Sequence, residues 1–350
     1  MVALFTAGGI IVDNVVAADG SVQLETMGGN AVYAAGGARL WIEPVGVVAN
    51  VPANYPRHWL GALRDAGLRT EGVSVLSETV VRSEWFIYRA DGSRIDHLHA
   101  PSGILGDLGY GATRLTSIEI AALEARLRAL PSDGLSYAEF RRRHPVGLDR
   151  LPASFAAARG VHLAPEQPSV QIALARRLRS KACYITTDPG FHAHTMRDDQ
   201  LGNLLASVDA FLPSEVELRA LCPELGMRAA LQRWVVRGVG VAGVKLGARG
   251  ACVFDGASGA VIDMPAAKIV ARDPTGAGDA FCGGFLGGFL RTGSVRVASC
   301  CAAVSASFAI EAFGPFHLLA TTRDAARARL AAFARDAELA DAALILRALA

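Results

Sequence analysis

The segment Asp273–Asp279, with the sequence Asp-Pro-Thr-Gly-Ala-Gly-Asp, combines a glycine-rich turn with a carboxylate at each end. A helical pattern follows it at once. Glycines at the start of a helix let backbone N–H groups approach an anion, and the helix dipole adds positive potential there. Asp279, in the first turn, would lie within reach of the same anion. The segment therefore predicts chemistry on an anionic group; the alternative is that its Gly and Asp residues only cap a buried helix.

The same segment resembles the C-terminal signature of the ribokinase-like, or PfkB, carbohydrate kinases. In that family the final Asp of the signature is the catalytic base, so the resemblance implies that Asp279 accepts the proton of the attacked hydroxyl. Phosphoryl transfer also needs stabilisation of the charge on the transferred group. The amides of Gly276, Ala277 and Gly278 would form this anion hole, and Thr275 would contact the nucleotide.

Two N-terminal segments resemble the acceptor-binding motifs of that family. Gly-Ile-Ile-Val-Asp, ending at Asp13, is similar to the first strand and turn, whose Asp binds the hydroxyls of the substrate. Gly28-Gly29-Asn30 resembles the N-terminal Gly-Gly signature, which lets the substrate lie close to the backbone. In sugar kinases a substrate-binding Asn commonly follows after three intervening residues. Tyr33 stands at that position, and its ring could stack on a ring of the acceptor.

Val244–Gly250 looks like the nucleotide-binding segment of the family, usually written T-L-G-x-x-G. The resemblance implies nucleotide contacts for Lys245, Gly247, Arg249 and Gly250. Lys245 replaces the usual Thr, which places a cation where the phosphates of the nucleotide are expected.

Leu212–Glu217 matches a segment that usually ends N-x-x-E, whose Glu organises magnesium and phosphate. The resemblance implies that Glu217 holds Mg²⁺, mainly through water, although Ser214 replaces the usual Asn. Asp188 follows a predicted strand, at a position near the magnesium region in the family; it either shares in organising the metal or caps a turn. The family sometimes binds a monovalent cation near the equivalent of Asp273, and this remains open for the present chain.

These motifs predict an ATP-dependent kinase that transfers the γ-phosphoryl group to a hydroxyl of a small sugar or sugar-like acceptor. One alternative is a nucleoside kinase of the same fold, motivated by Tyr33 and Trp85. Another is a degenerate family member that only binds a ligand or partner, motivated by Ser214 and the substituted sugar-binding position. The run Arg141–His144 either meets an anionic group of the substrate or forms a solvated charged face.

The composition excludes several other classes of protein. Hydrophobic residues make up 51% and charged residues 19% of the 350 residues, which argues against intrinsic disorder. The net charge of +2 is too balanced to indicate a nucleic acid or an anionic membrane as partner. No stretch approaches the ~18 apolar residues of a spanning helix, and the N-terminus lacks the basic region of a signal peptide. We therefore expect a cytoplasmic enzyme with a small-molecule partner.

Short β-rich runs alternate with helical patterns over most of the chain, which predicts an α/β fold. The resemblance specifies a ribokinase-like three-layer sandwich with a largely parallel central sheet. We expect strands at Ala3–Thr6, Val45–Asn50, Val161–Ala164, Tyr184–Thr187, Ala210–Leu212 and Val241–Leu246. We expect helices at Pro56–Ala66, Val170–Lys181, Glu215–Leu221, Arg228–Arg237, Gly278–Leu290 and Val295–Ala312, and a helical C-terminus over Arg323–Leu349.

Two extended segments interrupt this alternation, at residues 10–23 and 80–99. They are expected to pair as a small β lid beside the main α/β domain, which would comprise residues 1–9, 24–79 and 100–350. A region rich in Gly, Pro and charge, at about residues 105–155, is expected to be an insertion near the site. Lids of this kind sometimes make dimers in the family, so a homodimer through the lid is also left open.

Overall fold

The fold was analysed in a computed structural model, which describes residues 1–89, 94–96, 116–129, 133–149, 151–179, 183–337 and 342–349. Parts of the expected lid and of the expected insertion therefore lie outside the described residues. Of the helices within these ranges, none combines the length and the apolar character that a membrane crossing requires.

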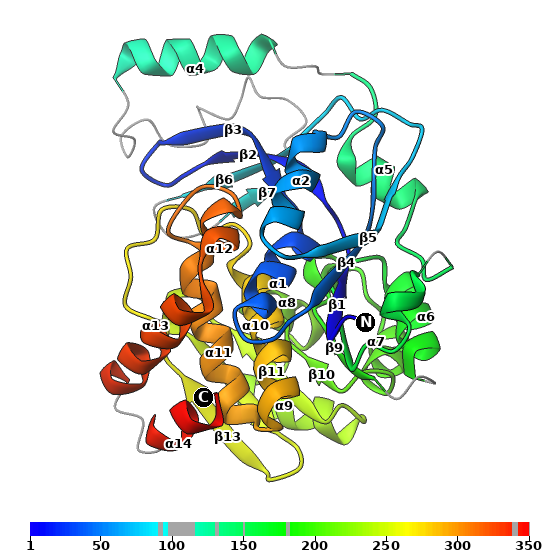
Figure 1. The fold of residues 1–350 in the computed structure, drawn as a ribbon, viewed down its shortest axis with the longest axis vertical. Coiled ribbons are helices and arrows are strands. Elements are labelled where there is room, and N and C mark those ends of the chain that lie inside the picture. Colours follow the sequence, from blue (N-terminus) through cyan, green and yellow to red (C-terminus); the bar gives the residue numbers. More distant parts are fainter. Residues whose placement is uncertain are drawn as a thin grey trace.

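A nine-stranded sheet forms the centre of the molecule, with the strand order β13-β12-β11-β10-β9-β8-β1-β4-β5 (Figure 1). The pairs from β11 through β5 are parallel, whereas β12 and β13 continue the sheet as antiparallel strands. The strands are β1 Leu4–Ala7, β4 Val45–Val51, β5 Arg69–Val75, β8 Gly160–Leu163, β9 Tyr184–Thr187, β10 Ala210–Phe211, β11 Val241–Lys245, β12 Ala251–Asp255 and β13 Ala260–Met264.

Helices cover both faces of this sheet because its strands are apolar on both sides. One apolar core joins the sheet to α6, α7 and α9, and two further cores join it to α1, α2, α10, α11, α13 and α14. The helices are α1 Asn30–Arg39, α2 Arg57–Asp65, α4 Ser117–Ala129, α5 Tyr137–Arg143, α6 Pro168–Arg179, α7 Asp198–Leu205, α8 Glu215–Leu221, α9 Met227–Val236, α10 Ala277–Thr292, α11 Val295–Ala309, α12 Phe316–Ala320, α13 Arg323–Asp336 and α14 Ala342–Ala348. The predicted three-layer α/β sandwich with a largely parallel sheet is confirmed.

A second sheet contains four strands in the order β3-β2-β6-β7. Its strands are β2 Ile11–Val16, β3 Val22–Gly28, β6 Glu84–Tyr88 and β7 Arg94–Asp96. Strand β6 lies parallel to β2, so the sheet joins two segments that are far apart in the sequence. In Figure 1 this sheet lies at the end of the molecule away from β13 and α14.

Small residues let α1 and α11 approach α10 closely. A Cβ on Gly283 or Gly37 would overlap backbone atoms of the facing helix, because α10 and α1 are in backbone contact there. On the other side, a Cβ on Gly288 would lie 2.8 Å from the sulfur of Cys301 in α11. These contacts fix α10, and with it the position of the Asp273–Asp279 turn at its N-terminus.

All six predicted strands lie in the central sheet, within one or two residues of their expected bounds. The prediction missed the parallel edge strand β5, the antiparallel strands β12 and β13, and the helices α1, α5, α7 and α12. The helical C-terminus is divided into α13 and α14.

Candidate active site

The parallel strands bring polar residues to one edge of the central sheet. Gly9 follows β1, Glu166 follows β8, Asp188 follows β9, and Lys245 is the last residue of β11. Because the carboxyl ends of parallel strands meet at one edge, this is where an open α/β sheet binds its ligands. The N-terminus of α10 lies at the same edge, since a Cβ on Gly278 would be 3.2 Å from the ammonium nitrogen of Lys245.

The turn before α10 depends on glycine at position 276. Gly276 has φ = 76°, in the left-handed region, and a Cβ there would overlap the ring of Tyr33. The first amides of a helix have no acceptor within the helix. Of these, the Ala277 amide donates to the carbonyl of Pro274 at 3.3 Å, so the amides of Gly276 and Gly278 are the stronger candidates for an anion hole.

Asp279 lies in the first turn of α10 and is partly buried. Burial raises the pKa of its carboxyl group to about 7, and the nearby Asp188 carboxylate adds to the shift. The positive charges of Lys245, Arg94 and Arg141 oppose it. A carboxylate that titrates near neutral pH is suited to general base catalysis.

Lys245 forms a buried ion pair with Asp188 beside the α10 turn. The side chains are only 11% and 5% exposed, respectively. The Lys245 ammonium also lies 3.7 Å from the sulfur of Cys282, and the Asp188 carboxylate accepts a hydrogen bond from the Gly190 amide at 3.0 Å. Burial by itself would lower the pKa of Lys245, but the charges around it, Asp188 foremost, raise it above its usual value, so the residue stays a cation.

Glu217 faces the same ion pair from α8. Its carboxylate accepts a hydrogen bond from the Ser214 amide at 2.6 Å, and its own amide donates to the Ser214 hydroxyl at 3.4 Å. Ser214 therefore caps the helix and holds Glu217 in place. Burial, together with the charge of Asp188, raises the pKa of Glu217 to about 7.

Asp13 and the Gly-Gly segment form a second polar group at the site. Asp13 is 1% exposed, and one of its carboxylate oxygens has no hydrogen-bond partner in the described structure. A Cβ on Gly28 would overlap this carboxylate, and Gly29, with φ = 108°, packs on the Gly9 carbonyl. Burial raises the pKa of Asp13, and the charges of Glu84, Asp273 and Asp279 contribute.

Asn30 connects this group to the end of β8. Its side-chain oxygen accepts a hydrogen bond from the Gly9 amide at 2.7 Å, and its side-chain nitrogen donates to the Pro165 carbonyl at 3.2 Å. Both ends of the amide are thus used to hold the backbone around the site.

Arg141 and Glu166 also lie at the site, although the sequence motifs did not identify them as site residues. Arg141, on α5, donates to the Pro165 carbonyl at 2.6 Å and lies 3.5 Å from the Glu166 carboxylate. Its guanidinium packs over Gly9, where a Cβ would be 3.0 Å away. The Arg-rich run pointed to this position, but it left open whether the run meets a ligand or water. Glu166 is 5% exposed and carried no motif.

The second sheet reaches the site through β6 and β7. The hydroxyl groups of Tyr88 and Thr275 are hydrogen-bonded at 2.9 Å, which ties β6 to the turn before α10. Arg94, on β7, contributes positive charge to both Asp13 and Asp279. Helix α5 is held to β6 by a hydrogen bond of 2.7 Å from the Ala138 amide to Glu84.

Tyr33 and Trp85 are not placed to stack on an acceptor. Tyr33 is 2% exposed and lies behind Gly276, and Trp85 is 5% exposed. The expectation that these rings face a substrate is corrected: Tyr33 supports the α10 turn, because the glycine there leaves the space that its ring fills.

The expected nucleotide segment forms a short turn, Gly247–Arg249, between β11 and β12. Gly250, with φ = 89°, packs its backbone against Pro265 and Ala266. Arg249 is largely exposed and forms an ion pair with Glu215.

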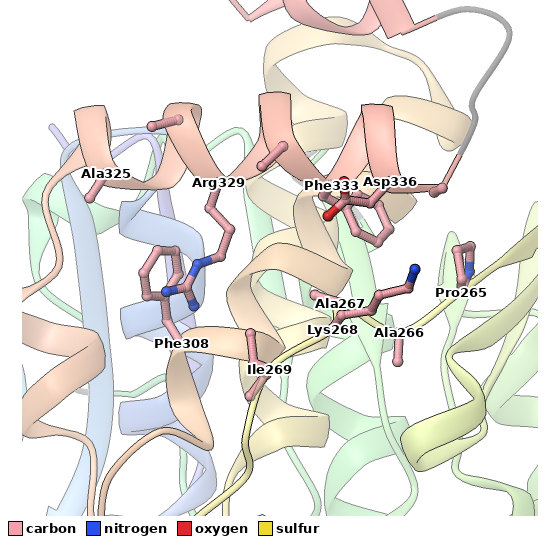
Figure 2. A pocket seen from close by; sticks show the side chains of 13 residues that line it. Pro265, Ala266, Ala267, Lys268, Ile269, Phe308, Ala325, Arg329, Phe333 and Asp336 are labelled. Atoms are coloured by element: carbon pink, nitrogen blue, oxygen red, sulfur yellow. The ribbon is translucent and has the colours of Figure 1, made fainter.

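A cavity of about 500 Å³ adjoins this segment, and Pro265 and Ala266 belong to its wall. The cavity lies between the irregular segment 265–269 that follows β13, helix α11 and helix α13 (Figure 2). Its wall is mostly apolar, and the guanidinium of Arg329 lies 3.5 Å from the ring centre of Phe308.

Within the described residues, no three His, Cys, Asp or Glu side chains are grouped so as to hold a metal ion by themselves. Mg²⁺ in kinases is commonly bound by one or two carboxylates, water and the phosphates of the substrate. Asp188 and Glu217 fit that arrangement, since both are carboxylates beside the α10 turn.

Comparisons with known proteins agree with this architecture. The model of the pfkB family of carbohydrate kinases matches residues 153–321. A cytidine kinase of Thermococcus kodakarensis is 25% identical over 292 residues, which cover 83% of this chain and 90% of that protein. A nucleoside kinase of Methanothermobacter thermautotrophicus is 31% identical over 155 residues, which cover 44% of this chain and 48% of that protein.

Solved structures of ribokinase-like proteins share the fold. A nucleoside kinase of Methanocaldococcus jannaschii, an archaeal member of the ribokinase family, superposes with a TM-score of 0.65 at 17% identity, covering 94% of this chain and 98% of that chain. A putative ribokinase II of E. coli in complex with ATP and Mg²⁺ superposes with a TM-score of 0.64 at 16% identity. The match covers 94% of this chain and 99% of that chain.

The family match over residues 153–321 and the curated relatives indicate an ATP-dependent kinase with a hydroxyl group as acceptor. The chain carries a PfkB family carbohydrate kinase domain in a ribokinase-like fold, as the sequence motifs predicted.

Proposed function

We propose that this kinase transfers the γ-phosphoryl group of ATP to a ribose hydroxyl of a nucleoside, with Asp279 as the general base. The observation that carries the proposal is that Asp279, in the first turn of α10, lies near enough to the buried carboxylate of Asp13 for its charge to contribute to the raised pKa of Asp13. The names of two curated relatives, a cytidine kinase and a nucleoside kinase, favour a nucleoside as acceptor.

In the proposed reaction the acceptor oxygen attacks the γ-phosphorus, and the bond from that phosphorus to the β-phosphate oxygen breaks. Asp279 accepts the hydroxyl proton, and ADP leaves. The amides of Gly276 and Gly278 stabilise the charge that develops on the transferred group. The Ala277 amide is a weaker candidate for this role, because it already donates to the Pro274 carbonyl.

Asp13 supplies the main contact to the acceptor. Its unpartnered, buried carboxylate oxygen is suited to accept hydrogen bonds from two sugar hydroxyls. Gly28 and Gly29 let the acceptor approach the backbone, Asn30 orders that backbone, and Arg141 covers it. The second sheet and α5 would act as a lid that excludes water from the transferred group.

The donor nucleotide would lie along the Gly247–Gly250 turn, where Arg249 would contact the phosphates or the ribose of the nucleotide. Lys245 and Thr275 flank the α10 turn, where the γ-phosphate would lie. The apolar cavity behind Pro265 is a candidate for the base of the nucleotide. Mg²⁺ would be held by Asp188 and Glu217, and it would supply positive charge that neutralises the donor phosphates.

A monovalent cation site is also consistent with Asp273. This residue is fully buried; one carboxylate oxygen accepts from the Thr275 amide at 2.9 Å, and the other has no partner in the described structure. A cation there would satisfy that oxygen and would stabilise the turn that ends at Asp279. A homodimer through the second sheet remains a prediction.

A free sugar is the second candidate acceptor. The burial of Tyr33 and Trp85 favours it, because no aromatic ring that the sequence suggested for base stacking is exposed to the acceptor.

The test is acceptor-dependent ADP release with ATP and Mg²⁺, measured over nucleosides that share one ribose and over free sugars. A nucleoside kinase discriminates among bases on the same ribose. Turnover of free sugars with no turnover of nucleosides would refute the nucleoside and establish the second candidate.

A further inference from the structure

The phosphate side of the proposed site contains a cation of its own. Lys245 takes the place of a neutral Thr in the motif that this segment resembles, and its side chain is nearly buried. Its ammonium lies between the Asp188 carboxylate and the α10 turn, 3.2 Å from the point where a Cβ on Gly278 would lie. A buried charge is costly unless it is paired, so Asp188 is what keeps this cation in place while no ligand is bound.

Asp188 therefore has two possible partners. In the structure it is paired with Lys245, but together with Glu217 it is also the carboxylate that would organise Mg²⁺. A carboxylate that is paired with a buried ammonium attracts a second cation less strongly, because the local charge is already balanced. When phosphates enter beside Gly278, they offer the ammonium a second anion within the same space.

We propose that Lys245 is a phosphate-binding residue that exchanges partners: it holds Asp188 in the free protein and turns to the donor phosphates when ATP binds, which releases Asp188 for the divalent metal. This proposal rests on the proposed function, since it assumes that the donor phosphates lie at the α10 turn. It assigns to this chain an order of binding, with the nucleotide preparing the metal site.

The exchange predicts opposite effects of one substitution on two ligands. Lys245→Thr removes a charge-assisted hydrogen bond to phosphate, so metal-free ATP is expected to bind about tenfold to a hundredfold more weakly. The same substitution frees Asp188 and Glu217 from a neighbouring positive charge, so Mn²⁺ alone is expected to bind about tenfold more tightly. A residue with only a structural role would not strengthen one ligand while it weakens the other.

The experiment uses the full chain and needs no turnover. Binding of ATP is measured by calorimetry in the presence of EDTA and again with Mg²⁺, and free Mn²⁺ is measured by electron paramagnetic resonance without nucleotide. Arg177→Met is the matched control. Arg177 lies on α6 and forms an exposed ion pair with Asp149, so this substitution also removes one ion-paired cation. Thermal unfolding shows whether each variant is folded.

Asp188→Asn provides an independent arm should Lys245→Thr fail to fold. It releases Lys245 from its partner, so metal-free ATP is expected to bind at least as tightly as to the wild type, whereas Mn²⁺ binds more weakly. The proposal is overturned if Lys245→Thr leaves the affinity for metal-free ATP or for Mn²⁺ unchanged, or if Asp188→Asn weakens metal-free ATP. A wild-type protein that fails to bind ATP even with Mg²⁺ would instead refute the proposed donor.

Discussion

The pH dependence of turnover tests the role of Asp279 quantitatively. Burial raises the pKa of this carboxyl group to about 7, and only the ionised form can accept a proton from the acceptor. With a pKa near 7, about 1% of the groups are ionised at pH 5 and about 90% at pH 8. We therefore expect kcat/KM for the acceptor, at saturating ATP and Mg²⁺, to fall about ninetyfold between pH 8 and pH 5.

The charges around Asp279 show how this titration can be assigned. Asp188 raises its pKa, whereas Lys245, Arg94 and Arg141 lower it. Arg141→Met should therefore move the acidic limb of the profile to higher pH by roughly half a unit to one unit. Titration of ATP itself would not move with this substitution.

Arg142→Met is the matched control for that shift, because Arg142 is an exposed neighbour on the same helix. The assay is coupled ADP release from pH 5 to pH 9, with stability checked at each pH. A profile that is flat between pH 5 and pH 8, or an acidic limb that stays in place in Arg141→Met, would refute the assignment of Asp279 as the base.

Three further predictions concern the geometry around this residue. Gly276→Ala would place a Cβ into the Tyr33 ring at a position with left-handed backbone. We expect kcat to fall by at least about 10² in steady-state kinetics and the free energy of unfolding, measured in urea, to fall by about 1–2 kcal/mol. A variant with wild-type kcat would contradict this. Gly28→Ala would displace the Asp13 carboxylate, so KM for the acceptor should rise by about tenfold or more. The affinity for ATP, measured by calorimetry, should be unchanged. If the affinity for ATP falls as much as KM for the acceptor rises, the effect is not specific to the acceptor site. Asp279→Asn should raise Tm relative to the wild type at pH 8 but not at pH 4. The reason is that a carboxyl group whose pKa is raised by folding stabilises the fold less as pH rises through 7. A lower Tm of the variant at pH 8 would contradict the claim that burial raises the pKa of Asp279.

The elements and motifs of local origin were predictable from the sequence. The apolar runs of six strands predicted most of the sheet, whereas the edge strand β5 has a largely polar, half-exposed sequence and was missed. The anion-binding role of the glycine-rich turn before α10 stays a prediction. The antiparallel strands β12 and β13 were missed, and so was α1, whose Gly and Ala residues carry little helical periodicity. Helix α1 forms because α10 packs against its backbone, which is a tertiary effect.

Contacts between distant segments of the chain also explain which side chains of the site the sequence did not predict correctly. The motif places Tyr33 near the Gly-Gly segment and so predicts that its ring faces the acceptor, but the direction of the ring depends on the space left by Gly276. Arg141 reaches the site only because α5 is held against β6 through Glu84. Local sequence carries neither contact, since each joins segments that are more than fifty residues apart.

The most direct test of the central claim is ADP release from the purified chain with ATP, Mg²⁺ and a panel of nucleosides and sugars, comparing the wild type with Asp279→Asn. We expect ADP release that depends on a hydroxyl acceptor and that falls by at least about 10²–10⁴ in the variant, which still folds and binds ATP. Near-normal turnover in Asp279→Asn would contradict the proposed mechanism.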